Sequence, residues 1–146
     1  MTSYVTRGFL DLAYRPDLHI VVGRWLRQIN LEELKQGYLD MLELAAAHQC
    51  PYWLLDARRR VDTDKDATGW MLSYFAPQLP LRLGGQRSYL AYLVAPTHLR
   101  DVASDANFPP VSYFQDKPYM SSRFTDEAQA VEWLLSCQQA PATKHT

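Results

Sequence analysis

The residues with the clearest capacity for chemistry are three consecutive arginines, Arg58, Arg59 and Arg60. Their guanidinium groups offer paired donors that can grip a phosphate or a carboxylate. A loop follows in which every second residue from Asp62 to Asp66 is an aspartate. Charge runs of this kind are usually solvated, and exposed ion pairs within them add little stability. The pattern therefore favours arginines that pair with the loop aspartates and with water over an anion-binding site.

The aspartates of that loop also resemble the start of a calcium-binding loop. Such a loop places glycine at its sixth position and a bidentate glutamate at its twelfth. Counted from Asp62, these positions hold Ala67 and Ser73, which can fill neither role. The four histidines and the two cysteines, Cys50 and Cys137, share no metal-ligand spacing. We therefore expect neither a metal site nor a cofactor.

No catalytic motif is found in the sequence. It contains no Gly-x-Ser-x-Gly nucleophile elbow, no Gly-rich phosphate loop and no dinucleotide fingerprint. Covalent or acid–base catalysis requires a nucleophile and a base that meet in space, and no spacing in the chain predicts such a pair. The sequence thus favours a protein without catalytic activity, with a hydrolase of unrecognised site as one alternative.

Aromatic residues are frequent in the second half of the chain, at Tyr89, Tyr92, Tyr113, Phe114 and Tyr119. Such residues can line a pocket for a lipophilic ligand. More often they pack a small core or a dimer face, where tyrosine combines apolar area with a polar tip. A small-molecule or lipid-binding protein is therefore the other alternative.

The composition limits the class of protein. Of the 146 residues, 47% are hydrophobic and 21% are charged, as in an ordinary globular domain. The 15 basic and 16 acidic residues give a formal net charge of -1, which argues against a general binder of nucleic acid or anionic membranes. The sequence shows neither a signal peptide nor a membrane-spanning apolar run, and two free thiols suit a reducing compartment. These features predict a cytoplasmic protein with one domain over residues 1–137 and a disordered tail over 138–146.

Hydrophobic periodicity predicts strands at Phe9–Tyr14, Leu18–Leu26, Tyr52–Ala57, Ser88–Val94 and either Val111–Phe114 or Tyr119–Phe124. The first two are joined by turn residues and form a hairpin. The third and fourth are apolar on both faces, as in central strands that helices cover on both sides. The pattern does not choose between the two positions of the last strand.

Three helices complete the pattern. The first begins with a capping box at Asn30 and ends near Gln49. The second begins at residues 66–68 with a buried stripe that includes Tyr74, and Thr125 caps the third. Because strands alternate with helices after the hairpin, we expect an α/β fold, a mixed β-sheet with an N-terminal hairpin that is flanked by helices.

Parts of the chain resemble the STAS domains, which have the SpoIIAA-like fold. In that family a hydrophobic strand ending in aspartate leads through a loop to an Asp-Ser-Ser-Gly-like motif at a helix start. Tyr52–Asp56 is similar to that strand, and Asp66–Gly69 is similar to the motif. Phe124–Leu134 is similar to the terminal helix of uncharacterised bacterial proteins of this type. The resemblance implies a SpoIIAA-like mixed sheet in a non-catalytic domain that acts through protein contacts.

The regulatory members of that family are phosphorylated on the first serine of the motif. Here Ala67 occupies that position, and only Thr68, one residue later, offers a hydroxyl. A phosphate on Thr68 would lie at a helix N-terminus, where negative charge is favourable. In the family, however, this second position is not the main switch. We therefore expect that Thr68 is not a regulatory phosphorylation site and that the domain stays in one state.

The predicted contact surface consists of Arg58, Arg59, Arg60 and Thr68, which share one strand-end loop and helix start. Open α/β sheets tend to meet their ligands and partners at such a place. The expected partner is another protein or a second copy of the chain, and nucleic acid is not expected. Under the alternative of a binding protein, a small molecule takes the partner's place.

Overall fold

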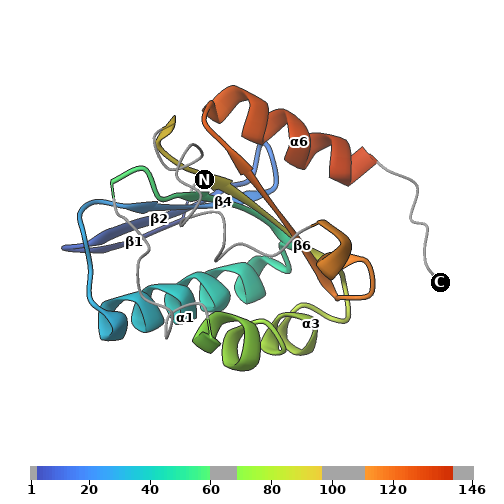
Figure 1. The fold of residues 1–146 in the computed structure, drawn as a ribbon, viewed down its shortest axis with the longest axis horizontal. Coiled ribbons are helices and arrows are strands. Elements are labelled where there is room, and N and C mark those ends of the chain that lie inside the picture. Colours follow the sequence, from blue (N-terminus) through green and yellow to red (C-terminus); the bar gives the residue numbers. More distant parts are fainter. Residues whose placement is uncertain (1–2, 60–68, 97–110, 140–146) are drawn as a thin grey trace.

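The strand Tyr52–Asp56 (β4) lies inside a six-stranded sheet (Figure 1). The computed structural model describes residues 3–59, 69–96 and 111–139. The other strands are β1 (Ser3–Arg7), β2 (Leu10–Arg15), β3 (Ile20–Trp25), β5 (Ser88–Leu93) and β6 (Tyr119–Phe124). Neighbours in the sheet follow the order of the sequence, with antiparallel pairing from β1 to β3 and parallel pairing from β3 to β6. The mixed sheet confirms the predicted α/β class.

Helices cover both faces of this sheet (Figure 1). On one face lie α1 (Leu31–His48) and α3 (Gln78–Arg82), the latter preceded by a short π-helix, η1 (Met71–Phe75). The other face is crossed by α6 (Glu127–Gln139), and a 3₁₀ helix, η2 (Val111–Phe114), precedes β6. None of the helices in the described part of the chain is both long and apolar enough to cross a membrane.

Each face of the sheet has an apolar core because β4 is buried on both sides. Trp53 and Leu55 are 0% exposed and belong to the core under α1 and α3. Leu54 is 1% exposed and belongs to a second, smaller core with Ile20 and with Leu134 of α6. The prediction of a central strand that is apolar on both faces is confirmed.

The ends of α1 lie where the sequence places them. Asn30 Oδ1 accepts a hydrogen bond from the Glu33 backbone N–H at 2.8 Å, and Glu33 Oε1 accepts one from the Asn30 backbone N–H at 3.2 Å. The last helical residue is His48, and Gln49 adopts the left-handed conformation with φ of 47°. This reciprocal cap satisfies two backbone donors that a helix N-terminus otherwise leaves without a partner.

The N-terminal hairpin differs from the prediction in two respects. The predicted hairpin consists of β2 and β3, and an additional strand, β1, pairs antiparallel with β2. The three strands together form an antiparallel meander. An edge strand is held by backbone hydrogen bonds and needs no apolar alternation, which explains why hydrophobic periodicity does not predict it. The second hairpin strand begins at Ile20 rather than Leu18, because His19 ends the turn with φ of 55°. The hydroxyl of Tyr14 holds the ring of His19 there, with an Oη to Nδ1 distance of 2.7 Å.

The structure identifies the position of the last strand and the capping residue of α6. Of the two candidate segments, Tyr119–Phe124 is the strand, and Val111–Phe114 is the 3₁₀ helix. Helix α6 is capped by Asp126 rather than Thr125, since Asp126 Oδ2 accepts a hydrogen bond from the Gln129 backbone N–H at 3.3 Å. Gln138, expected in the tail, belongs to α6 and donates to the carbonyl oxygen of Leu18 at 2.9 Å.

The segment from η1 to α3 departs from the predicted second helix. Its predicted start at residues 66–68 lies outside the described residues. Within η1 the Ala76 backbone N–H bonds to the Met71 carbonyl, five residues earlier, which shifts the faces of the helix away from the 3.6-residue period. Phe75 is buried as expected, but Tyr74 is 54% exposed, so its predicted place in the buried stripe is wrong.

Candidate functional site

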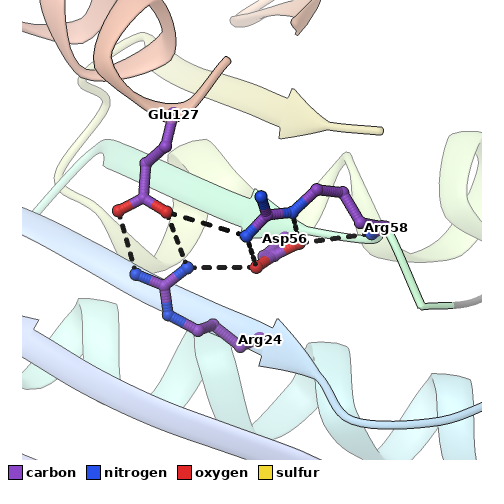
Figure 2. A network of polar contacts seen from close by, with 4 residues as sticks. All are labelled: Arg24, Asp56, Arg58 and Glu127. Carbon is purple, nitrogen blue, oxygen red and sulfur yellow. Dashed lines mark hydrogen bonds and ion pairs between the residues drawn. The ribbon is translucent and has the colours of Figure 1, made fainter. Parts of the chain in front are cut away.

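Four charged side chains meet at the carboxyl edge of the parallel strands (Figure 2). Arg24 comes from β3, Asp56 is the last residue of β4, Arg58 follows it, and Glu127 is the first residue of α6. We call these four residues the ion cluster. Local structure brings them together, because Arg24 and Asp56 are paired in register between adjacent parallel strands. Glu127 adds its negative charge to the N-terminal turn of α6, where the helix dipole favours it.

Asp56 is the centre of the ion cluster. Its Oδ1 accepts hydrogen bonds from Arg58 Nε at 3.0 Å and from the Arg58 backbone N–H at 3.2 Å. Its Oδ2 accepts from Arg58 Nη2 at 2.8 Å and from Arg24 Nη1 at 3.0 Å. Both oxygens of the carboxylate are therefore bound, and the Arg58 contact has the bidentate geometry that strengthens arginine–carboxylate pairs.

Glu127 closes the ion cluster on the α6 side (Figure 2). Its two oxygens accept from Nη1 and Nη2 of Arg24 at 2.9 and 3.0 Å, and Arg58 Nη2 lies 3.9 Å from Oε1. The cluster thus holds two positive and two negative charges and is neutral as a unit. The network links the ends of β3 and β4 to helix α6 through charges that balance one another.

Burial differs among the four residues. The Asp56 side chain is 10% exposed, whereas those of Arg24, Arg58 and Glu127 are between 38% and 44% exposed. Burial by itself raises the pKa of Asp56, but hydrogen bonds from Arg58 and Arg24 outweigh it and hold the pKa below its ordinary value. The hydrogen bonds from Arg24 lower the pKa of Glu127, and those to Glu127 raise the pKa of Arg24. All four groups are therefore held in their charged forms at neutral pH.

The predicted contact surface is described only in part. Arg58 is bound to Asp56, so its guanidinium is engaged within the chain, and the loop aspartates predicted as its partners lie outside the described residues. Arg59 is exposed, and no other residue of the described ranges bonds to its side chain. Arg60 and Thr68 lie outside the described residues. Only one of the four predicted residues is thus seen both exposed and available to a partner.

Arg24 and Glu127 were not among the predicted site residues. A charged residue in an apolar strand such as β3 needs a partner, and this signal points from Arg24 to Asp56 on the next predicted strand. No local pattern points to Glu127, which lies 103 residues further along the chain. The position of α6 over the sheet is a tertiary feature that periodicity does not specify.

Within residues 3–59, 69–96 and 111–139, no group of three or more histidine, cysteine, aspartate or glutamate side chains could hold a metal ion. Both cysteines are free thiols, and burial raises the pKa of Cys50 to about 11, so that it stays protonated and unreactive at neutral pH. Comparisons of the chain with family models, with curated proteins and with solved structures gave no match.

Proposed function

We propose that the chain is a non-catalytic, STAS-like α/β domain that acts through contact with a partner protein. The proposed contact surface is the carboxyl edge of the sheet next to the ion cluster, with Arg59 as its exposed cation. This assignment rests on the contrast between two neighbouring residues, Arg58 bound to Asp56 and Arg59 facing solvent. The first fixes the backbone at the end of β4, and the second offers its guanidinium to a carboxylate on another molecule.

The electrostatics of the ion cluster support a contact role over a catalytic one. A general acid or base works best with a pKa near the working pH. The pKa values of Asp56 and Glu127 lie below their ordinary values, and the pKa of Arg58 lies above its own ordinary value. All three pKa values are therefore shifted further from neutral pH. Their charges instead fix the positions of two strands and a helix at the proposed surface.

The family resemblance supports the same assignment. The β4 strand ends in Asp56, as in the strand of the family motif, and the sheet is mixed with helices on both faces. Because Ala67 replaces the family's phosphorylated serine, we propose that partner binding is not switched by a kinase. Thr68 is the residue at which a phosphate would contradict this view.

The experiment compares proteins captured by tagged wild-type chain and by Arg59→Glu from the same host extract, quantified by mass spectrometry. Charge reversal at the contact should remove at least one protein from the captured set, while the melting temperature stays unchanged. Arg15→Glu is the matched control. Arg15 is also an exposed arginine, but it is the last residue of β2, lies at the end of the sheet opposite the ion cluster, and is paired with Asp17. It should leave the captured set intact.

Four outcomes would contradict the proposal. Identical captured sets for wild type and Arg59→Glu would remove this surface, and equal losses in both variants would show a general charge effect. A hydrolysed product formed by wild type but not by Asp56→Asn would show catalysis at the ion cluster. An intact mass heavier by one phosphate in the same preparations, with the phosphate mapped to Thr68 by peptide sequencing, would contradict the absence of a kinase switch.

A further inference from the structure

A hollow in the surface lies at the amino ends of β5 and β6, opposite the strand ends that carry the ion cluster, on the face that α6 covers. It has a volume of about 370 Å³ and is lined by Arg87, Tyr89, Gln115, Met120, Trp133 and Cys137. Arg87 precedes β5, and Tyr89 and Met120 are paired in register at the starts of β5 and β6. The hollow is therefore separate from the ion cluster, which occupies the carboxyl edge.

From this hollow we infer that the chain binds a small aromatic carboxylate, a molecule of one or two fused rings that bears a single acid group. The inference goes beyond the proposed protein contact and does not depend on it. Three observations carry it, namely the aromatic walls, the arginine at the rim and the size of the hollow.

The walls of the hollow are aromatic and fixed in place. The Tyr89 and Trp133 rings meet edge to face, with centroids 6.2 Å apart and an interplanar angle of 72°. Tyr89 also stacks on Tyr52 at 5.6 Å, and Trp133 packs on Phe124 at 5.7 Å. Tyr89 and Trp133 are only half-buried, so part of each ring remains available to a planar apolar group.

Arg87 supplies the positive charge. Its Nη2 donates to the Phe114 carbonyl oxygen at 2.8 Å, which holds the guanidinium 5.9 Å from the centroid of the Tyr89 ring. No carboxylate in the described part of the chain forms an ion pair with Arg87. Arg87 is exposed and lines the hollow. An arginine held in this way can bind a carboxylate with two hydrogen bonds.

The charges of the lining residues and the volume of the hollow limit the charge and size of the ligand. None of the six is acidic, and burial raises the pKa of the Cys137 thiol, which therefore stays neutral beside Arg87. A single guanidinium neutralises a monocarboxylate, whereas it would leave a phosphate dianion with excess negative charge. The volume lies at the low end of the range for small-molecule pockets, and it accommodates an apolar part of one or two rings.

Isothermal titration calorimetry with 1-naphthoate and with its neutral counterpart, 1-naphthalenemethanol, tests this inference. We expect wild type to bind the acid more tightly by about tenfold, the size of a charge-assisted hydrogen-bond contribution. Arg87→Gln should bind both compounds equally, at the affinity of the alcohol, while its melting temperature is unchanged. Arg15→Gln, which removes another exposed arginine, should bind like wild type.

Equal affinity of wild type for the acid and the alcohol would overturn the inference, as would no heat with either compound at millimolar concentration. A full preference for the acid in Arg87→Gln would show that the charge comes from elsewhere. Saturation-transfer NMR gives an independent readout, because protons on both naphthyl rings should receive signal from the protein. Failure here would leave the captured proteins of the Arg59 experiment unaffected, so the two proposals are tested separately.

Discussion

Arg24 and Glu127 are 103 residues apart in the sequence, yet their side chains form two hydrogen bonds of 2.9 and 3.0 Å. The same arginine reaches Asp56 at 3.0 Å. One guanidinium thus connects the last strand of the meander, the central strand and the C-terminal helix. Since Asp56 is the buried member of this group, it is the residue through which the ion cluster can be tested.

Replacing Asp56 by Asn should destabilise the fold by about 1–3 kcal/mol. The amide keeps the shape of the side chain, but it loses the charge and presents an N–H group to Arg58 or Arg24. Urea unfolding followed by circular dichroism measures the change. The control is Asp17→Asn, because Asp17 has a similar bidentate bond to Arg15 but is 59% exposed. Its unfolding midpoint should shift less, and an equal shift would show that the ion cluster has no special role in stability.

The stability of the fold should also fall in acid. The pKa values of Asp56 and Glu127 lie below their ordinary values of 3.8 and 4.5, so the unfolded chain binds these protons more tightly than the folded chain does. The ion cluster therefore contributes its full stability above about pH 5 and loses it as the pH falls through the lowered values. Urea unfolding of wild type and Asp56→Asn at several pH values should show a gap that narrows below about pH 4. A gap that is constant or widens in acid would refute this assignment.

Gly37→Ala should destabilise the protein although alanine is the better helix former. A Cβ atom on Gly37 would lie 2.5 Å from Cη2 of Trp25 and 2.9 Å from Cδ2 of Leu10, and both side chains are 1% exposed. Overpacking of this kind costs about 1–3 kcal/mol, which exceeds the helix-propensity gain of at most about 1 kcal/mol. The melting temperature should fall. Gly8→Ala, where the added Cβ meets no atom of the described chain within 4 Å, should leave it nearly unchanged.

Leu55→Ala should cost about 2–5 kcal/mol, because its side chain is fully buried beneath α1 and α3. The matched control is Leu81→Ala, since Leu81 is 81% exposed on α3 and its truncation leaves no cavity. The control should change the free energy of unfolding by less than about 0.5 kcal/mol. Similar values for the two variants would mean that β4 is not the centre of the core.

The elements that were predicted well are those with strong local signals. The capping box fixes the start of α1, and the continuous apolar run of β4 identifies a strand buried on both faces. The elements that were mispredicted depend on longer-range interactions or on irregular geometry. Strand β1 is held by pairing with β2, and the i+5 hydrogen bond of η1 moves Tyr74 out of the face that a regular helix would bury.

The candidate site was predicted in part for the same reason. The end of β4 was identified correctly as a place where charged residues gather, and Arg58 does lie there. The sequence did not single out Asp56 as a partner of Arg58, although Asp56 is only two residues away and is positioned by the sheet. The contribution of Glu127 depends on how α6 docks, and the hollow at Arg87 depends on side chains from three separate elements.

The order of the strands in the sheet has a consequence for synthesis of the protein. Because each strand pairs with the one before it, a nascent chain can extend the sheet strand by strand as it leaves the ribosome. The exception is α6, which emerges after all six strands and covers apolar residues of β3, β4 and β5, Ile20, Leu54 and Ala91 among them. A chain that ends at Phe124 should therefore bind a hydrophobic dye and aggregate, and a monomeric, dye-free product would disprove this. Nascent molecules in which α6 has not yet been synthesised are the ones that a chaperone would have to shield.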